Sequence, residues 1–570
     1  MENRPWLKNY PESIPHKIDY PQLALQDFLK NAVNKCPDNV AIHFMGTDLT
    51  YRFVYDAAKK FAGYLQSIGI EKGDKVAIML PNLPQGVIAF FGILMAGGVV
   101  VQTNPLYTER ELEFQMNDSE AKAIIALEIL HPRIMKIIGN TKLKHVIATA
   151  IKDFLPFPKN LIYPFMQKKQ YGFSVKLKHE GNIHLFTEIL KRAPKPLKEY
   201  SYNVEEDVAL LQYTGGTTGF PKGVMLTHKN LVSNAMMCSI WLGDTTEGTE
   251  KVLGVLPLFH VYGMTTVLVL TILKCNTMIL LPKFDVKTTL ETIHKQKPTL
   301  FPGAPTIYIG ILNSPLLENY DISSIRACIS GSAALPVEVI NLFESKVPNG
   351  RMVEGYGLTE SSPVTHCNVI WGKEYVKGSI GVPWPDTDAR IRSLETDEDL
   401  PVGEIGELCV NGPQVMKGYW KRPEETAEVL KDGWLYTGDI GYMDEDGYFY
   451  IVDRKKDMII AGGFNIYPRE IEEVLYEHPA IQEVVAAGVP DAYRGETVKV
   501  YIIVREGMNV TEAELNEFCR KHLAAYKVPR LYEFRTELPK TIVGKVLRRQ
   551  LVEEERQKLA AMKVDEPKEA

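Results

Sequence analysis

The chain has 570 residues, of which 45% are hydrophobic and 24% are charged, and its formal net charge is -6 at pH 7. A chain of this length exceeds what a single hydrophobic core normally holds, so we expect two or more domains. The negative net charge argues against nucleic acid as the main partner, because binding to a phosphate backbone needs a basic surface.

The first part of the chain alternates between strand and helix patterns. We expect strands over 75–80, 99–102 and 123–127 and a helix over 87–96, and the block 252–281 has similar apolar runs. This alternation is typical of parallel α/β layering. Between about 390 and 450 the pattern changes to short strands separated by glycine and aspartate turns.

A charged run, 453–457, precedes a compact C-terminal α+β unit. In this unit we expect strands over 484–489 and 498–504, and a helix that begins at a capping box formed by Thr511 and Glu514. The chain is therefore divided into a large domain, 1–453, and a smaller one, 454–570.

The seven cysteines form no Cys-x-x-Cys pair and no zinc-binding spacing. This is typical of reduced, mostly buried thiols in a cytosolic protein. The first residues contain no apolar segment, so we expect no secretory signal. The most hydrophobic run, 86–101, is shorter than the ~20 residues of a membrane-spanning helix and contains Gly97 and Gly98. We therefore expect a cytoplasmic protein without a transmembrane segment.

The segment 154–178 interleaves aromatic residues and prolines with lysines and has almost no acidic residue. It could form a peripheral contact with the inner face of a membrane, because aromatics suit the headgroup level and lysines attract anionic lipid. It could equally be a surface insertion whose aromatics pack onto the domain. Its prolines argue against a long amphipathic helix.

A segment rich in glycine and threonine, YTGGTTGFPKGVMLTH at 213–228, follows the apolar run 208–211. The order is typical of a strand that leads into a phosphate-binding loop, because glycines accept left-handed dihedrals and successive N–H groups bind anions. Threonine hydroxyls can also ligate Mg²⁺, and Lys222 supplies a positive charge. The spacing does not fit a Walker loop, because Phe220 and Pro221 separate Gly219 from Lys222.

Five further motifs follow along the chain. They are LPLFHVYG at 256–263 with His260, GSAAL at 331–335, EGYGLTE at 354–360, DGWLYTGDIG at 432–441, and PKTIVGKVLR at 539–548 with Lys545. We expect Asp439 of the fourth motif to lie on a tight turn. Each motif alone has an ordinary structural explanation, such as a core histidine or a capped turn. Six motifs in one order are better explained by a shared function.

Together the six motifs resemble those of the adenylate-forming superfamily, which includes acyl-CoA ligases, luciferases and the adenylation domains of peptide synthetases. The segments 81–113, 432–456 and 457–475 are similar to bacterial long-chain fatty-acid–CoA ligases. The resemblance covers essentially the whole chain. It implies an α/β fold with an N-terminal adenylating domain of two α/β subdomains plus a small β-barrel. It also implies a mobile α+β C-terminal lid with a hinge near Lys456.

The resemblance also implies the reaction, which is the ATP-dependent ligation of a long-chain fatty acid to coenzyme A through an acyl-adenylate, releasing AMP and pyrophosphate. Lys545 would bridge the fatty-acid carboxylate and the α-phosphate, and Glu360 with Thr217 would hold Mg²⁺. His260 lies where the family closes the acyl pocket, for which positioning is favoured over general-base catalysis. Gly462, Gly463 and Phe464 suit a narrow tunnel for the pantetheine arm of coenzyme A.

The remaining implied contacts hold the nucleotide. The β- and γ-phosphates would lie on Thr214, Gly215, Gly216, Thr218, Gly219 and Lys222, and the α-phosphate on Thr359. Tyr356 would stack on the adenine, whose edge would lie near Gly331, Ser332 and Ala333, and the ribose hydroxyls would bind Asp439 and Arg454. Glu354 and Gly355 would also belong to the nucleotide site.

Other functions remain as alternatives. An amino-acid-activating domain would carry an aspartate after Phe259, where this chain has His260. Medium-chain and aryl-acid CoA ligases differ only in the walls of the acyl pocket. A non-catalytic lipid or nucleotide sensor is disfavoured by the intact Lys545, Glu360 and Asp439 motifs. The sequence leaves the oligomeric state open, a homodimer included.

Overall fold

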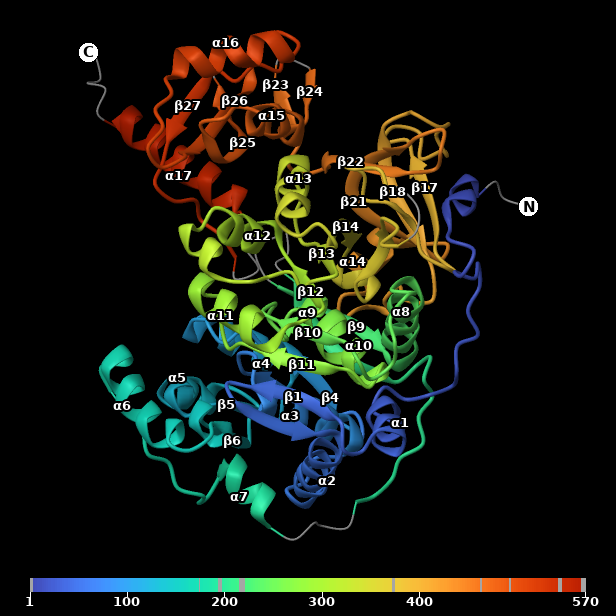
Figure 1. Ribbon diagram of the computed structural model, residues 1–570, viewed down its shortest axis with the longest axis vertical. Coiled ribbons are helices and arrows are strands. Elements are labelled where there is room, and N and C mark those ends of the chain that lie inside the picture. The colour runs from blue at the N-terminus through green and yellow to red at the C-terminus, as the bar shows by residue number, and fades with distance from the viewer. Residues whose placement is uncertain are drawn as a thin grey trace.

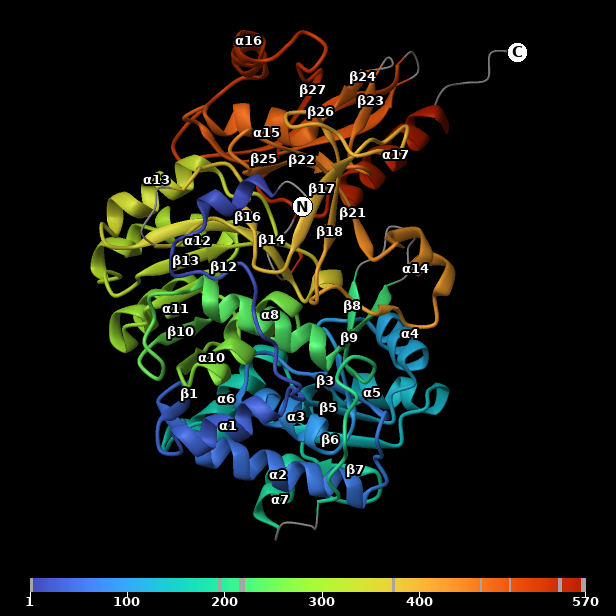
Figure 2. The same ribbon diagram turned by 90° about the vertical axis from the view of Figure 1, so that its right-hand side faces the viewer.

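The computed structural model describes residues 4–173, 175–192, 197–214, 221–371, 375–461, 464–491, 494–541 and 546–564. Four β-sheets organise this part of the chain, and helices cover their faces. The C-terminal α+β unit lies at one end of the long axis and the first α/β layer at the other end (Figure 1). The view at 90° shows the same separation (Figure 2).

The first sheet has eight strands in the order β19-β9-β8-β4-β3-β5-β6-β7. Their bounds are β3 Lys75–Met79, β4 Val99–Gln102, β5 Ala123–Leu127, β6 His145–Thr149, β7 Ile183–Leu185, β8 Val208–Thr214, β9 Lys222–Thr227 and β19 Gly418–Tyr419. The strands from β8 to β7 pair in parallel, whereas β9 and β19 add to the other edge in antiparallel pairs.

The second sheet has nine strands in the order β16-β15-β14-β13-β12-β10-β11-β1-β2. Their bounds are β1 Val40–Phe44, β2 Thr47–Thr50, β10 Lys251–Gly254, β11 Thr277–Leu280, β12 Leu300–Gly303, β13 Ala327–Ser330, β14 Arg351–Gly357, β15 Val364–Cys367 and β16 Val382–Pro383. The first two strands of the chain thus belong to the second α/β layer, beside β11.

The third and fourth sheets are smaller. The third has the order β17-β18-β21-β20, with β22 beside β21. It lies in the part of the chain where the small β-barrel was expected. Its strands are β17 Asp388–Arg392, β18 Gly406–Asn411, β20 Leu430–Lys431, β21 Trp434–Met443 and β22 Phe449–Arg454. The fourth has the order β24-β23-β26-β25, with β27 beside β26; its strands are β23 Ile459–Ala461, β24 Phe464–Ile466, β25 Ile481–Asp491, β26 Gly495–Val504 and β27 Leu531–Phe534.

The helices lie against these sheets. Their bounds are α1 Asp27–Lys35, α2 Tyr51–Ser67, α3 Pro84–Met95, α4 Glu109–Ser119, α5 His131–Ile137, α6 Lys159–Tyr171, α7 Phe186–Lys191, α8 His228–Trp241, α9 Val261–Gly263, α10 Leu270–Leu273, α11 Val286–Gln296, α12 Pro305–Leu312, α13 Val337–Lys346, α14 Pro423–Val429, α15 Pro468–Tyr476, α16 Glu512–His522 and α17 Arg548–Val564.

Helix α3 explains how the two large sheets share one core. Its residues from Pro84 to Leu94 are all buried, and its apolar side chains pack in one cluster with residues of both sheets, such as Val76 of β3 and Val252 of β10. A helix that is apolar on every side needs apolar neighbours on every side. The expected buried helix within 86–101 is confirmed, and no helix among the described residues is long and apolar enough to cross a membrane.

Most local expectations are confirmed. The strands at 75–80, 99–102 and 123–127 form, and the capping box of Thr511 and Glu514 begins α16. All seven cysteines are free thiols and all but Cys36 are buried. The boundary between residues 453 and 454 stays a prediction; it falls within the last residues of β22, before the turn that leads to β23.

One expectation needs correction. Asp439 does not lie on a tight turn, because it lies inside β21, where Gly438 has a φ of 73° and the pairing register shifts between Ile440 and Gly441. A positive-φ glycine marks both turns and bulges, so the sequence pattern did not separate them. Within the segment 154–178, only Lys159–Tyr171 form a helix, α6, which contains Pro164 and is shorter than the long helix that the prolines argued against.

Candidate active site

One large cavity, of about 1820 Å³, lies where the two large sheets, the third sheet and the C-terminal unit meet. Residues from the motifs line this cavity: Thr214, Lys222, His260, Gly331, Ser332, Ala333, Glu354, Gly355, Tyr356, Thr359, Glu360, Asp439, Arg454 and Lys456. The site is therefore assembled from segments that lie far apart in the sequence.

Two loops of the second sheet form one wall of the cavity. The loop after β13 begins with Gly331, and its Ser332 has a φ of 72°, a left-handed conformation that non-glycine residues rarely adopt. At the end of β14, a Cβ on Gly357 would overlap the carbonyl oxygen of Pro363, so only glycine allows this close approach. The backbone conformation of both loops thus depends on the motif residues themselves.

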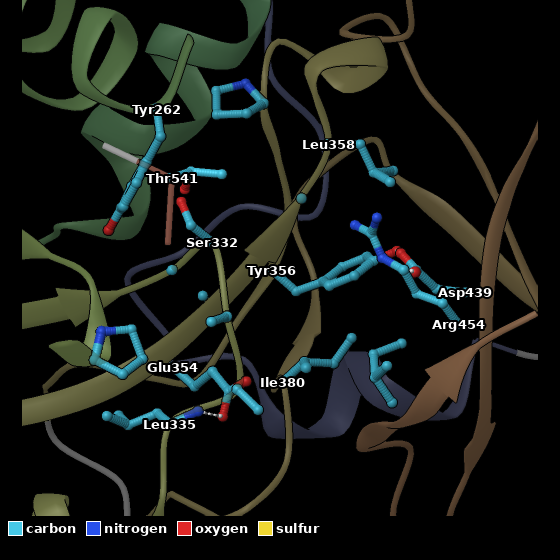
Figure 3. Close-up of a pocket in the computed structure, with 18 of the residues that line it drawn as sticks. Tyr262, Ser332, Leu335, Glu354, Tyr356, Leu358, Ile380, Asp439, Arg454 and Thr541 are labelled. Carbon is cyan, nitrogen blue, oxygen red and sulfur yellow. Dashed lines mark hydrogen bonds and ion pairs between the residues drawn. The ribbon is translucent and has the colours of Figure 1, made fainter. Parts of the chain in front are cut away.

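Tyr356 of β14 reaches Asp439 of β21 and Arg454 of β22, and the three side chains form a connected polar group (Figure 3). The Tyr356 hydroxyl donates to Asp439 Oδ2 at 2.6 Å, and Arg454 Nε lies 3.2 Å from Asp439 Oδ1. Burial, together with the Asp439 carboxylate, raises the pKa of Tyr356 well above its ordinary value, so its hydroxyl keeps its proton. Asp439 lies directly opposite Arg454 in the pairing of β21 with β22. This pairing fixes the carboxylate beside the aromatic ring.

Glu354 is a buried carboxyl group in the cavity wall, with 5% of its surface exposed. Its Oε2 accepts the backbone N–H of Leu335 at 3.3 Å (Figure 3). Burial raises the pKa of Glu354 to about 7, and the positive charge of Arg469 in the C-terminal unit opposes this shift. The group is therefore part of an electrostatic contact between the second sheet and the C-terminal unit.

Lys222 and Glu360 face the cavity close to the end of the expected phosphate loop. Lys222 forms an ion pair with Glu425 of α14, and its ammonium lies 5.1 Å from the ring centroid of Tyr419. The Tyr419 hydroxyl donates to Glu360 Oε1 at 2.8 Å. Among the described residues, this is the only side-chain hydrogen bond to the Glu360 carboxylate, so its second oxygen remains available to a cation.

His260 connects the polar part of the cavity with an apolar part. Its Nδ1 accepts the backbone N–H of Tyr262 at 3.3 Å and so caps α9. Apolar side chains from several elements line the same cavity: Cys238 and Trp241 of α8, Val252 of β10, Leu270 of α10, Leu300 of β12, and Ile370 after β15. These are the walls against which an apolar substrate chain could lie.

The C-terminal unit contacts the cavity through charged groups near the expected hinge. Arg548 lies 3.7 Å from Asp453, 3.0 Å from Asp457 and 2.7 Å from Glu472. Arg469 donates its backbone N–H to Asp453 Oδ2 at 2.9 Å. Burial lowers the pKa of Lys456, which lines the cavity at the hinge position. These ion pairs join segments on the two sides of the expected hinge.

Some predicted residues are not placed by this geometry. Gly215, Gly216, Thr217, Thr218, Gly219, Gly462, Gly463 and Lys545 lie outside the described residues, and Phe464 is described only as the first residue of β24. Conversely, sequence reasoning missed Tyr419 and Glu425. Tyr419 lies 59 residues from its partner Glu360 in the chain, and no motif spacing marks it.

Comparisons with known proteins agree with this geometry. Residues 29–420 match the family model of AMP-binding enzymes, and residues 470–545 match the AMP-binding enzyme C-terminal domain. Over 556 residues the chain is 56% identical to a long-chain-fatty-acid–CoA ligase of Bacillus subtilis (strain 168), and the match covers 97% of this chain and 99% of the relative.

Two solved structures have the same fold. The chain matches ATP-bound MatB from Rhodopseudomonas palustris with a TM-score of 0.81 and 30% identity, over 93% of this chain and 99% of that chain. It matches the anthranilate CoA ligase AuaEII, in complex with anthranoyl-AMP, with a TM-score of 0.83 and 27% identity. This match covers 95% of this chain and 99% of that chain. The fold is that of the adenylate-forming superfamily. Within it, the chain belongs to the family of AMP-binding enzymes.

The raised pKa of Glu354 gives a pH-dependent contribution to stability. The folded protein holds a proton that the unfolded chain releases between pH 4.5 and about 7, so this stabilisation is present at low pH and is lost as pH rises through about 7. Glu354→Gln stays neutral at every pH. From pH 5 to pH 8 the wild type should therefore lose about 2.5 kcal/mol more of its unfolding free energy than the variant.

Denaturant unfolding of both proteins at pH 5 and pH 8 measures this difference. Glu395→Gln, at an exposed position, is the matched control and should respond to pH as the wild type does. An equal pH response of Glu354→Gln and the wild type would show that folding does not raise the pKa of Glu354.

Proposed function

We propose that this protein ligates a long-chain fatty acid to coenzyme A in an ATP-dependent reaction that proceeds through an acyl-adenylate and releases AMP and pyrophosphate. The observation that carries the proposal is the 56% identity, over nearly the whole chain, to a relative named for this activity. The cavity supports it, because polar groups suited to a nucleotide and apolar walls suited to an acyl chain line one space.

The first step needs charge compensation, because a negative carboxylate must approach a negative α-phosphate. Lys545 bridges the two groups, and Thr359 contacts the α-phosphate. Tyr356 stacks on the adenine, while Asp439 and Arg454 bind the ribose hydroxyls. A carboxylate can accept hydrogen bonds from both ribose hydroxyl groups. The Asp439 carboxylate is held in place by the hydrogen bond that the Tyr356 hydroxyl donates to it.

Glu360 and Thr217 would hold a Mg²⁺ ion. The carboxylate of Glu360 fits this role, because only one of its oxygens accepts a hydrogen bond from the described side chains. Carboxylate and hydroxyl oxygens are the ligands that Mg²⁺ prefers. The ion, when bound, neutralises part of the negative charge on the pyrophosphate group. Lys222 adds a second positive charge beside the phosphate loop.

In the second step the thiol of coenzyme A attacks the acyl-adenylate and displaces AMP. The C-terminal unit, 454–570, acts as a lid that moves about a hinge near Lys456 between the two steps. Gly462, Gly463 and Phe464 border a tunnel for the pantetheine arm. His260 closes the acyl pocket after adenylation, and its role as the cap of α9 supports positioning over proton transfer.

The apolar walls around Trp241, Leu270 and Leu300 support a long acyl chain as the substrate. Burial of each CH₂ group contributes about 0.8 kcal/mol, so a deep apolar pocket favours long chains. An aryl acid is the second candidate, because the match to an anthranilate CoA ligase covers 95% of this chain.

Product analysis tests the reaction. The protein is incubated with ATP, Mg²⁺, coenzyme A and either palmitate, octanoate or benzoate, and nucleotides and thioesters are measured by chromatography. We expect AMP and palmitoyl-CoA in equal amounts, with slower turnover of octanoate and benzoate. A higher kcat/KM for benzoate would replace the proposal with aryl-acid ligation, and ADP as the product would contradict an adenylate intermediate.

The role of Lys545 can be tested on the two half-reactions. Two unit charges about 4 Å apart interact by roughly 4 kcal/mol at an effective dielectric constant of 20, which corresponds to about a thousandfold in rate. Lys545→Ala should slow adenylation by about this factor and leave thioester formation from supplied palmitoyl-AMP almost unchanged. Lys521→Ala, an exposed lysine of the same unit, is the control. An equal loss in both half-reactions would contradict the assigned role.

The segment 154–178 supports a peripheral contact with the membrane. Along and beside α6, five apolar side chains are between 51% and 78% exposed: Phe157, Leu161, Ile162, Phe165 and Met166. Lys168 and Lys169 lie in its last turn. Clustered exposed apolar residues beside basic residues suit a surface of anionic lipid.

Vesicle sedimentation tests this contact. The wild type should bind vesicles of phosphatidylglycerol more tightly than vesicles of phosphatidylcholine, and more weakly as salt increases. Phe157→Ser combined with Phe165→Ser should weaken binding about tenfold or more, because two large apolar side chains no longer enter the bilayer. Leu106→Ser removes an exposed apolar residue elsewhere and is the control. Unchanged binding of the double variant would exclude α6 as the membrane contact.

A further inference from the structure

The segment 418–425 leads from the first sheet into α14 and lies beside both ends of the expected phosphate loop. Its first residues form β19, which pairs with β9 through Gly418 opposite Met225 and Tyr419 opposite Val224. The backbone N–H of Trp420 donates to the carbonyl oxygen of Gly223 at 2.7 Å. Strand β9 begins at Lys222, so this segment holds the strand that leaves the loop.

The same segment also fixes the strand that enters the loop. Tyr213, near the end of β8, donates its hydroxyl to Asp118 of α4 at 2.7 Å. Trp420 Nε1 donates to the backbone oxygen of Asp118 at 3.0 Å, and Arg422 Nη2 lies 3.3 Å from the Asp118 carboxylate. Both ends of the loop are therefore tied to one short segment.

Tyr419 touches two charged groups assigned to the polyphosphate. Its hydroxyl donates to Glu360 Oε1 at 2.8 Å, and its ring lies 5.1 Å from the ammonium of Lys222. Burial raises the pKa of Tyr419 far above the neutral range, so the hydroxyl stays protonated and remains a donor. The hydrogen bond occupies one oxygen of Glu360 and orients the other.

Glu425 is the second residue of this segment that contacts the ammonium group of Lys222. It forms an ion pair with Lys222, and its second oxygen lies 3.5 Å from Arg422 Nε. The side chains of Lys222 and Glu425 are 16% and 30% exposed, so the pair is less screened than one on the open surface. A lysine that would otherwise occupy many rotamers is thereby held in one.

From these contacts we propose that Tyr419 and Glu425 are positioning residues of the polyphosphate site, Tyr419 acting through Glu360 on the bound cation and Glu425 acting through Lys222 on the terminal phosphates. The inference rests on the roles of Lys222 and Glu360 in the proposed function and adds two residues that no motif identified.

The number of N–H donors on Lys222 decides whether loss of Glu425 weakens or strengthens ATP binding. The ammonium has three N–H groups, so Lys222 can keep Glu425 while it donates to a phosphate oxygen. Without Glu425 its flexible stem is free and loses this freedom only when ATP binds. Loss of Glu425 should therefore weaken ATP binding.

A double-mutant cycle in equilibrium binding tests Glu425. The dissociation constant of ATP with Mg²⁺ is measured by titration calorimetry in the absence of fatty acid and coenzyme A, where no turnover takes place. Glu425→Gln should raise it about fivefold, the size expected for one such contact. In a Lys222→Met background the same substitution should change it less than about twofold. Glu424→Gln, the exposed neighbour on α14, should have no effect.

Tyr419→Phe tests the second residue, because it keeps the ring beside Lys222 and removes only the hydroxyl. The ratio of the ATP dissociation constants measured with EDTA and with Mg²⁺ should fall about fivefold, since one hydrogen bond to Glu360 is lost. ATP binding in EDTA should stay within about twofold of the wild type. Thermal unfolding of each variant confirms that the measured protein is folded.

These measurements separate the inference from the proposed function. If Lys222→Met alone leaves ATP binding unchanged, the assigned role of Lys222 is wrong and the inference for Glu425 is overturned with it. Suppose that Lys222→Met weakens ATP binding. If Glu425→Gln then tightens ATP binding, or if the effects of the two substitutions are additive, the proposed function stands and the role of Glu425 is overturned. An unchanged Mg²⁺ ratio in Tyr419→Phe overturns the role of Tyr419.

Discussion

Pairing of charges inside a partly buried cavity is the constraint on which the rest of the site depends. Removing an ion from water costs several kcal/mol unless it gains a partner, so the cations that line this cavity need partners within the folded chain. Arg454 is paired with Asp439, and Lys222 with Glu425. Each pair joins segments from different parts of the chain, and so the same interactions that hold the charges also hold the walls of the cavity together.

The same principle applies to the C-terminal unit. Arg548 contacts Asp453 on one side of the expected hinge and Asp457 and Glu472 on the other side. Burial raises the pKa of Asp453 to about 6, partly offset by the Arg548 charge, which makes this carboxyl group dependent on its partners. These ion pairs join segments on the two sides of the predicted domain boundary.

Local structure was predictable where it depends on neighbours in the sequence. The buried strand at β3, the apolar helix α3 and the capping box of α16 follow from periodicity and capping alone. The position of Asp439 did not follow, because a glycine with positive φ is the signal for a turn and for a bulge alike, and only pairing with β22 decides between them.

The sequence by itself determined which residues gather at the site, because the motifs carry their chemistry in short, recognisable spacings, and the described side chains of those motifs line one cavity. Only the tertiary structure decided how the walls are joined. Strands β1 and β2 belong to the second α/β layer, and β19 extends the first sheet beside β9. Tyr419 and Glu425 reach Glu360 and Lys222 through this strand addition. Pairing between distant strands depends on the total contact energy of the folded chain, and no local period in the sequence encodes it.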